Sequence, residues 1–303
     1  MKVVIAGGTG FIGRHLSVNL VSHGHEVIVL SRGGDQTRAE PGVRLVAWDA
    51  RSVAGGWADQ LRGADGMVNL AGASIGSGRW SKPRMAEILN SRLEATGAIV
   101  QALQQTPADQ RPRVLVNASG IDYYGDRGEE TITEESAPGG SFLARVSQQW
   151  EAAAGQAEPL GVRVVLMRTA LVFGRGAPAF RLMVLPFRLF AGGPLGHGRQ
   201  WFTWIHLDDL VALYRFALEH DAVKGPLNAV APDLRRQREV AREIGRALHR
   251  PSIMPVPAPL LKLALGHQSE LLLAGRRATP QKAERLGYAF RFPDLPGALA
   301  STL

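Results

Sequence analysis

The stretch KVVIAGGTGFIG, residues 2–13, decides the fold class. It opens with a short apolar run of the kind that a buried parallel strand shows, and three glycines with GxxGxxG spacing follow. The next dozen residues repeat apolar side chains at helical spacing, and a second apolar run, EVIVLSR, occupies residues 26–32. A strand, a glycine turn, a helix and a strand within about thirty residues predict a βαβ unit.

The same alternation continues along the chain. Apolar runs predict strands at residues 43–49, 66–72, 113–119 and 162–169, and helical spacing predicts helices at residues 83–104 and 142–157. This order predicts an α/β fold with a doubly wound, Rossmann-type parallel sheet. We expect a Rossmann domain at residues 1–175, to which residues 200–230 return. Prolines and glycines interrupt the pattern afterwards. Residues 176–199 and 235–303 predict a small C-terminal lobe on the substrate side, in which residues 235–303 are mainly helical.

Composition narrows the classes of function. The chain has no cysteine, which excludes disulfides, thiolate catalysis and cysteine-ligated metal centres. Its eight histidines show no HxxxH or HExxH spacing, so we expect no metal site. The net charge is +8, yet the basic residues are mostly scattered arginines, so we expect no nucleic-acid partner. No apolar run is long enough for a signal peptide or a membrane span, and a cytoplasmic protein without a membrane partner is expected.

The glycine turn predicts a dinucleotide site. Such a site needs a tight turn, a backbone that touches a pyrophosphate, and close packing of the helix on the strand. Backbone N–H groups at the start of the helix also attract phosphate. The expected cofactor-binding residues of the turn are Gly7, Thr9, Gly10, Phe11, Ile12 and Gly13.

The ends of the next three strands refine this prediction. Ser31 and Arg32 offer an arginine for a 2′-phosphate and no acid for a 2′-hydroxyl, which favours NADP(H) over NAD. Asp49 is placed either to meet the adenine edge or to cap its own strand. Small or apolar residues end the fourth strand and leave room for the nicotinamide ribose: Leu70, Ala71 and Gly72.

Taken together, these stretches resemble the extended short-chain dehydrogenase/reductase superfamily. More narrowly, the chain is similar to an atypical, epimerase-like family of unassigned substrate with an uncharacterised C-terminal domain. The matching stretches are GGTGFIG (7–13), NLAGASIGSGRW (69–80), NSRLEAT (90–96), YYGDRGEE (123–130), QQWEAAA (148–154), LMRTALVFG (166–174), GGPLGHGRQWFTWIHLDDL (192–210) and FRFPDLPGAL (290–299).

One departure from the superfamily pattern bears on chemistry. Active members use a tyrosine, with a lysine four residues on, as the acid–base group. The resemblance places Leu143 and Ser147 at these two positions, and no YxxxK occurs anywhere in the chain. An aliphatic side chain cannot transfer a proton, so the usual dyad is absent.

Three residues are candidates for replacement chemistry. Ser119 ends the fifth strand, where it either orients a reacting oxygen or bonds only to backbone. Tyr123 offers a phenol or packs against its neighbours. His206 titrates near neutral pH or holds the lobe in register. Other side chains are expected at the mouth of the site, where they suit an anionic ligand: Arg79, Trp80, Lys82, Arg199 and Trp201.

The sequence thus predicts an NADP-binding epimerase-like or reductase-like enzyme for a small polar substrate of anionic character. The alternative is an NADPH-binding sensor or regulatory protein without turnover. Relatives in the superfamily dimerise through helices equivalent to residues 83–104 and 142–157, so the resemblance also implies a homodimer.

Overall fold

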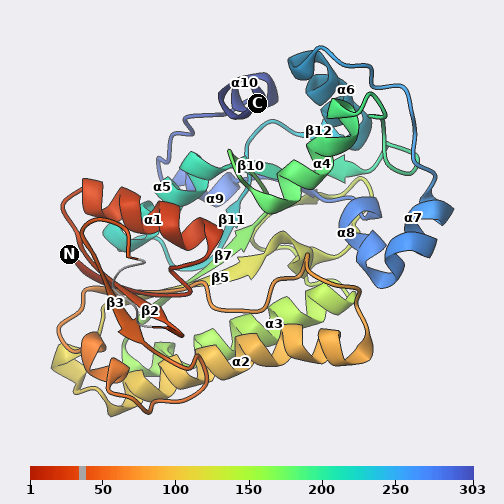
Figure 1. Ribbon diagram of the computed structural model, residues 1–303. Helices are drawn as coiled ribbons and strands as arrows, with labels where there is room; N and C mark the ends of the chain where they lie inside the picture. The colour runs from red at the N-terminus through yellow and green to blue at the C-terminus, as the bar shows by residue number, and fades with distance from the viewer. Residues whose placement is uncertain (34–38) are drawn as a thin grey trace.

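A seven-stranded parallel sheet runs through the centre of the structure, a computed structural model that describes residues 1–33 and 39–303 (Figure 1). The strand order is β11–β7–β5–β4–β1–β2–β3. The strands are β1 (Lys2–Ala6), β2 (Glu26–Ser31), β3 (Val43–Ala47), β4 (Gly66–Asn69), β5 (Val114–Gly120), β7 (Arg163–Thr169) and β11 (Gly225–Ala229). All neighbouring strands are parallel, which confirms the predicted doubly wound Rossmann-type fold.

The order of the strands reverses between β1 and β4. From β1 the chain first builds outward through β2 and β3, then returns to the other side with β4, β5, β7 and β11. The register pairs Ala6 with Asn69 and Asn69 with Asn117, so the carboxyl ends of β1, β4 and β5 meet at one edge. Ligands of open α/β sheets bind in the crevice beyond such a switch point.

Helices cover both faces of the sheet (Figure 1). α1 (Phe11–Ser22) and α5 (Leu207–Glu219) share one apolar layer with the sheet. α2 (Lys82–Gln105) and α3 (Phe142–Gly155) share the other. Serine hydroxyls cap the starts of α2 and α3, where Ser81 accepts from the N–H of Arg84 and Ser141 from the N–H of Ala144. These four helices therefore bury both faces of the sheet and leave the carboxyl ends of its strands open for a site.

The C-terminal lobe is mainly helical, as predicted. Its helices are α4 (Pro178–Arg188), α6 (Gln237–Leu248), α7 (Ala258–Leu265), α8 (Glu270–Leu273), α9 (Gln281–Arg285) and α10 (Leu295–Thr302). Two short strand pairs join it to the Rossmann domain: β9 (Trp201–Phe202) with β12 (Arg235–Arg236), and β6 (Thr131–Ile132) with β13 (Arg277–Ala278). A third pair, β8 (Leu171–Phe173) with β10 (Trp204–His206), joins two segments of the Rossmann domain itself.

Two elements differ from the sequence prediction. α1 begins at Phe11, inside the glycine motif, so the first turn of the helix is part of the glycine turn itself. The prolines of residues 176–199 were expected only to interrupt the pattern, yet α4 forms there. Pro178 stands in the first turn, where its missing N–H costs nothing, and Pro186 lies near the end of the helix. No helix within the described residues is long and apolar enough to cross a membrane.

Candidate functional site

The glycine turn joins β1 to α1 at the switch point. Gly7 has a φ of +75°, and a Cβ on it would lie 2.8 Å from the carbonyl carbon of Leu70. A Cβ on Gly13 would lie 2.5 Å from the Cα of Gly8. A Cβ on Gly10 would instead meet only the Gly7 carbonyl oxygen, at 3.3 Å. Two glycines thus permit close packing, while the third leaves its outer side open.

The start of α1 is shaped to receive an anion. Gly10 is the N-cap and provides no capping side chain, and the first turn contains no acidic residue. The first intrahelical bond runs from the N–H of Arg14 to the carbonyl of Gly10, and the N–H groups of Phe11, Ile12 and Gly13 have no acceptor among the described residues. Unused donors and the positive end of the helix dipole favour phosphate at this point. The turn therefore fits a pyrophosphate.

Arg32 lies exposed just beyond the end of β2, beside Ser31. It makes no ion pair with any residue in 1–33 or 39–303, so its guanidinium is available to a ligand. The only acid on β2, Glu26, stands at the opposite end of the strand. An arginine without an acid at this end of β2 favours a 2′-phosphate over a 2′-hydroxyl.

Asp49 is engaged in a local turn. One carboxylate oxygen accepts from the N–H groups of Arg51 and Ser52 at 2.8 and 2.9 Å, and the other accepts from the Ser52 hydroxyl at 2.7 Å. These hydrogen bonds, led by that of the hydroxyl, hold the pKa of the Asp49 carboxyl below its usual value. The geometry favours the interpretation as a cap, and the contact with adenine stays a prediction.

Ser119 is part of a buried network rather than free. The side chain is 6% exposed, and its hydroxyl donates to Glu151 at 2.6 Å. Arg168 binds both oxygens of the same carboxylate, through Nε at 2.9 Å and Nη2 at 2.7 Å. Arg168 also donates to the Tyr124 hydroxyl, which donates in turn to Asn228, each at 2.8 Å. The Ser119 hydrogen is therefore committed to Glu151, and only lone pairs remain for a ligand.

The two adjacent tyrosines have different surroundings. Tyr124 is fully buried, and burial raises its pKa to about 12, so that it stays a neutral donor in the network. Tyr123 is half-buried, and its ring lies 3.5 Å from the Cζ of Arg168. Among the described residues the Tyr123 hydroxyl has no hydrogen-bond partner. Tyr123 is thus the tyrosine whose phenol remains available.

His206 serves the structure of the lobe. Its Nδ1 accepts from the N–H of Asp208 and so caps α5, and its Nε2 lies 3.1 Å from the Ser301 hydroxyl of α10. The ring packs on Phe292 at 3.8 Å between centroids, and burial lowers the pKa of the imidazole. Within the described residues it touches neither Ser119 nor Tyr123. The contacts favour the interpretation in which His206 holds the lobe in register.

The carboxyl end of β5 carries a further carboxylate, that of Asp122. A Cβ on Gly120 would lie 3.6 Å from the Asp122 carboxylate and 3.7 Å from the Ser147 hydroxyl. Asp122 forms an ion pair with Arg276, with 2.7 Å between Oδ1 and Nη2. Arg276 is 6% exposed and comes from the C-terminal lobe. The place at which the resemblance expects a lysine is therefore occupied by a serine next to an aspartate–arginine pair.

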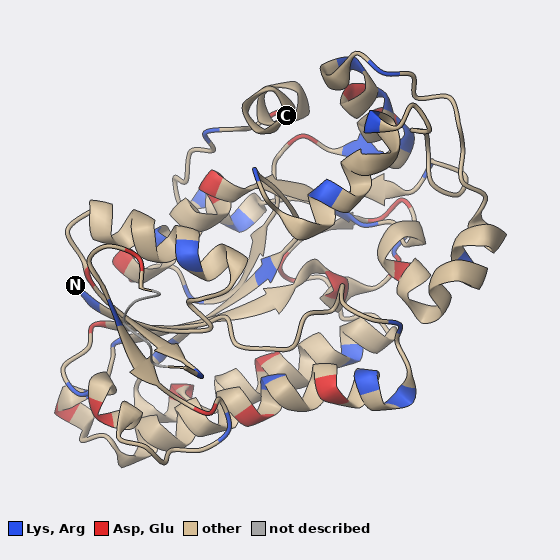
Figure 2. Ribbon diagram, viewed as in Figure 1, with Lys and Arg blue, Asp and Glu red and all other residues tan. Residues whose placement is uncertain are grey.

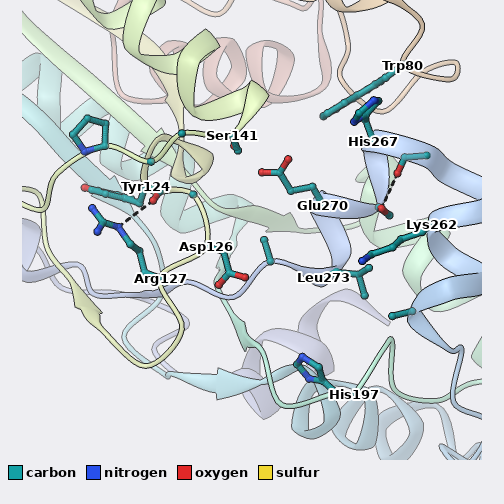
Figure 3. A pocket seen from close by; sticks show the side chains of 18 of the residues that line it. Trp80, Tyr124, Asp126, Arg127, Ser141, His197, Lys262, His267, Glu270 and Leu273 are labelled. Carbon is teal, nitrogen blue, oxygen red and sulfur yellow. Dashed lines mark hydrogen bonds between the residues drawn. The ribbon is translucent and has the colours of Figure 1, made fainter.

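A cleft of about 980 Å³ lies between the two lobes (Figure 3). Its charged and aromatic lining consists of Arg79, Trp80, Tyr124, Asp126, Arg127, His197, Lys262, His267 and Glu270. In Figure 3, the Glu270 carboxylate points toward Ser141. Basic side chains outnumber acidic ones along this lining, which suits an anionic ligand.

The predicted mouth residues divide between the cleft and its surroundings. Arg79 and Trp80 line the cleft, whereas Lys82 and Arg199 are exposed and do not line it. Trp201 lies between two arginines, 3.9 Å from the Cζ of Arg236 and 4.8 Å from that of Arg277. Trp201 therefore packs between segments instead of facing the ligand.

The comparisons with known proteins agree with this geometry. Residues 3–229 match the NAD dependent epimerase/dehydratase family, and residues 256–302 match a domain of unknown function, DUF1731. The chain belongs to the NAD dependent epimerase/dehydratase family.

Two relatives are similar to this chain over nearly their whole length. It is 36% identical over 304 residues to the epimerase family protein YfhF of Bacillus subtilis, covering 100% of this chain and 98% of that protein. It is 38% identical over 307 residues to the human epimerase family protein SDR39U1, covering 99% and 98%.

Solved structures of the family extend the likeness to three dimensions. A crystal structure of human SDR39U1 with NADPH superposes with a TM-score of 0.86 at 35% identity, covering 99% of this chain and 98% of that one. A nucleoside-diphosphate sugar epimerase from Corynebacterium glutamicum gives a TM-score of 0.78 at 33% identity, with 99% of this chain and 57% of that one covered.

In this family member, the DUF1731 match supplies site residues that sequence reasoning missed. Lys262, His267, Glu270 and Arg276 all fall within it. No motif in the sequence marks them, because they approach the sheet edge only through tertiary folding. The sequence offered one indirect signal. Asp122 follows a buried strand, where a carboxylate needs a cationic partner, and that partner is Arg276. In residues 1–33 and 39–303, no group of three or more acidic or histidine side chains is arranged to hold a metal ion.

Proposed function

We propose that this chain binds NADPH and acts as an epimerase-like or reductase-like enzyme on a small polar, anionic substrate in the cleft between its lobes. The observation that carries the proposal is the open phosphate cradle at Gly10, with Arg32, which forms no ion pair with the described residues, at the end of the neighbouring strand. The human relative, which is 35% identical over nearly the whole chain, binds NADPH in its crystal structure, and this supports the choice of cofactor.

The residues assigned to the cofactor follow the sheet edge. The N–H groups of Phe11 to Gly13 bind the pyrophosphate, and Arg32 binds the 2′-phosphate. Residues 70–72 border the nicotinamide ribose in this proposal. The bound nicotinamide supplies hydride transfer, and the protein supplies orientation, charge and protons.

The proton chemistry falls to Tyr123 and Ser119 in this proposal. The Tyr123 hydroxyl has no partner among the described residues, so it is free to donate to a substrate oxygen. The Ser119 oxygen, held by Glu151, accepts a hydrogen bond from a substrate hydroxyl. His206 has no part in it, because both of its ring nitrogens are already engaged.

A second candidate function is a non-catalytic NADPH-binding sensor. The absence of YxxxK and the commitment of the Ser119 hydrogen to Glu151 favour it. The cleft with its charged lining favours the enzyme, because a protein that reports only cofactor occupancy needs no second binding site.

A titration with NADPH, followed by a substrate panel, tests the proposal. The purified protein is titrated while nicotinamide fluorescence is recorded, and the loaded protein is then mixed with carbonyl compounds and sugar nucleotides while absorbance is followed. Oxidation by one compound class supports a reductase, and conversion of a sugar nucleotide to its epimer without net oxidation, detected by chromatography of the products, supports an epimerase. Binding with neither outcome across the panel selects the sensor, and a failure to bind NADPH refutes both.

The Arg32→Asp variant should change the preference between cofactors. It removes the cation assigned to the 2′-phosphate, so affinity for NADPH should fall about 10- to 100-fold while affinity for NADH is retained. Arg44→Asp is the matched control, because Arg44 lies exposed on β3 and its guanidinium donates a hydrogen bond to Gln60. Unchanged NADPH affinity in Arg32→Asp would refute the assignment.

A further inference from the structure

The helix α4 is apolar on the face that it turns to solvent as well as on the face that it buries. The inner face packs into the core of the C-terminal lobe and consists of Phe180, Val184 and Phe187. On the outer face Leu182, Leu185 and the C-cap residue Leu189 recur at spacings of three and four residues, and their side chains are 49% to 68% exposed. A surface helix normally presents polar residues to water. The outer leucines therefore form a stripe that the described residues leave uncovered.

Phe190 extends this stripe in an unfavourable backbone conformation. Its φ is +59°, in the left-handed region that side chains disfavour. The N–H of Phe190 donates to the carbonyl of Phe187, and the N–H of Ala191 donates to that of Pro186. This is the Schellman pattern, which glycine usually completes. The ring is 59% exposed, so its burial does not offset the strain. Strain without a folding benefit indicates that the ring serves a contact outside the chain.

The segment between α6 and α7 adjoins the end of α4. The N–H of Met254 donates to the carbonyl of Gly192 at 3.1 Å, and the Cζ of Arg250 lies 4.4 Å from the centre of the Phe190 ring. Figure 1 shows α4 and this segment on the side of the molecule away from α2 and α3. Together they carry one exposed apolar surface, the outer patch, which consists of Leu182, Leu185, Leu189, Phe190, Ile253 and Met254.

The outer patch lies in segments that carry only positive charge. Residues 175–199 and 244–269 contain seven basic residues and no acidic one. Of these seven, Arg246 alone forms an ion pair within the part of the chain that the structure describes. Arg181 and Arg188 are exposed, lie seven residues apart on α4 and therefore flank the leucine stripe on one side. An occupant of the patch must offer both an apolar surface and negative charge.

A second copy of this chain does not meet both requirements, whereas an anionic membrane does. A symmetric dimer brings the same surface of two molecules together, so the arginines beside each patch would face one another. At a membrane, apolar side chains enter the boundary between headgroups and acyl chains while arginines bind the anionic headgroups. Ile253 is 78% exposed and projects from the surface. A fluid lipid layer receives such a side chain without the matching pocket that a protein partner needs.

We propose that the outer patch binds the surface of an anionic lipid membrane. The leucine stripe and Phe190 enter the headgroup boundary, and Arg181 and Arg188 bind the headgroups. The chain lies on the membrane without spanning it. No continuous apolar run marks this surface, so the sequence predicted no membrane partner. The proposal adds a location to the proposed function and depends neither on NADPH binding nor on turnover.

Sedimentation of the full-length protein with lipid vesicles tests the proposal. One set of vesicles contains phosphatidylcholine alone, and the other an equal mixture of phosphatidylcholine and phosphatidylserine. The wild type should bind the mixed vesicles about 10-fold or more tightly than the phosphatidylcholine vesicles, and salt should weaken this binding. Equal binding to both sets, or no binding to the mixed set, would refute the proposal.

Two apolar variants separate binding from folding. Phe190→Gly relieves the left-handed conformation, so its melting temperature should be equal to or above that of the wild type, while its affinity for the mixed vesicles should fall about 10-fold. The double variant Leu182→Gln, Leu189→Gln should lose about 10- to 100-fold in affinity. Val18→Gln is the matched control, because Val18 is exposed on α1, outside the patch. Equal losses in the control and the double variant, or unchanged affinity in both patch variants, would contradict the assignment.

A charge variant distinguishes the patch from the overall positive charge. The double variant Arg181→Gln, Arg188→Gln should weaken binding to the mixed vesicles about 10- to 30-fold. Arg44→Gln with Arg62→Gln is the control, since it removes two exposed arginines from the Rossmann domain. If both pairs of substitutions weaken binding equally, diffuse attraction explains the binding and the proposal is wrong.

The other possible occupants give different results. Sedimentation velocity of the wild type that shows a dimer, dissociated by Leu182→Gln with Leu189→Gln, together with no binding to vesicles, would assign the outer patch to a second copy. Binding to polyglutamate without binding to the mixed vesicles would assign it to an acidic protein segment. Either result would overturn the proposal and leave the proposed function intact.

Discussion

Glu151 and Arg168 show how a single buried pair directs the side chains around it. Their side chains are 8% and 3% exposed, and their bidentate contact neutralises both charges. Glu151 then orients the Ser119 hydroxyl, and Arg168 covers the ring of Tyr123. Removing either partner would leave an uncompensated buried charge. Ser119 and Tyr123 therefore owe their orientations to residues that do not face the ligand.

His206 gives rise to a pH-dependent stability. Burial holds the folded-state pKa of the imidazole below the unfolded value of about 6.5, so the unfolded chain binds a proton that the folded chain refuses. The free energy of unfolding should be highest above about pH 6.5 and should fall as the pH drops toward the folded pKa. The charged groups facing the ring are Asp208, Asp209 and Arg291.

The His206→Asn variant should reduce this pH dependence, because an asparagine can still cap α5 and does not titrate. Urea unfolding at pH 7.5, 6.5 and 5.5 measures the effect. Burial raises the pKa of Asp209, whose protonation stabilises the folded state as pH falls, so lower pH values are avoided. An equal loss of stability in wild type and variant would show that His206 is not the titrating group.

Local patterns predicted the residues that act through backbone shape and missed those that act through long-range pairing. The spacing of Gly7, Gly10 and Gly13 predicted a tight turn between a strand and a helix. The structure contains this turn, and a Cβ on Gly7 or Gly13 would clash with backbone there. Asp122 and Arg276 form a pair although they lie far apart in the chain, so no local sequence pattern predicts the pair.

In the turn between β1 and α1, one glycine is needed for folding and another for binding. Gly13→Ala would place a Cβ 2.5 Å from the Gly8 Cα and 2.6 Å from the Gly7 carbonyl oxygen, both of which are backbone. It should destabilise the fold by about 1–3 kcal/mol. Gly10→Ala meets only one oxygen at 3.3 Å, with an allowed φ of −73°, so it should fold nearly as the wild type does.

The same two variants should rank differently in binding. The new methyl group of Gly10→Ala points to the open side of the cradle and should weaken NADPH binding despite the near-normal fold. Thermal denaturation and NADPH titration of both proteins measure the two effects separately. A Gly10→Ala protein that binds NADPH normally would show that the pyrophosphate does not lie against this residue.

The elements predicted well are those with continuous apolar patterns. The five predicted strands that follow β1 were located within a few residues of β2, β3, β4, β5 and β7, and α2 and α3 were found nearly to the residue. α4 was missed because its two prolines read as breaks, although one stands in the first turn. The two-residue strands β6, β9, β12 and β13 exist only as tertiary pairs, so no local pattern predicts them.

Across the whole molecule, the excess of positive charge belongs to the C-terminal lobe. Residues 176–199 and 235–303 contain fifteen basic and five acidic residues, so the lobe carries a net charge of +10 and the rest of the chain a net charge of −2. Figure 2 shows basic positions along α4 and α6 in this lobe. The overall charge therefore originates beside the cleft, on the side expected to meet an anionic ligand.

The homodimer through α2 and α3 stays a prediction. Large apolar side chains that are exposed in the described residues do not lie on either helix. They are Val18, Leu182, Leu185, Leu189, Phe190, Ile253, Met254, Leu260 and Leu263. Eight of these nine lie between residues 182 and 263, so apolar burial offers α2 and α3 little drive to associate.

The Rossmann domain and the C-terminal lobe should unfold as one cooperative unit. The residues that match DUF1731 bond back to the main domain at several points: Arg276 with Asp122, the Thr279 carbonyl with the Asn228 side chain, and the N–H groups of Arg291 and Phe292 with Asp209. None of these contacts lies within one lobe alone. Loss of any one should therefore lower the stability of the whole chain.

Arg276→Met tests this unity. It leaves Asp122 largely buried without its partner, which should cost about 3 kcal/mol and lower the melting temperature by several degrees, while the transition stays single. Adding Asp122→Asn should recover part of the loss, because the unpaired charge is then removed. Differential scanning calorimetry of the wild type, the single variant and the double variant measures both effects. Two separate transitions, with only one of them shifted by Arg276→Met, would show instead that the lobe folds and melts independently of the sheet it covers.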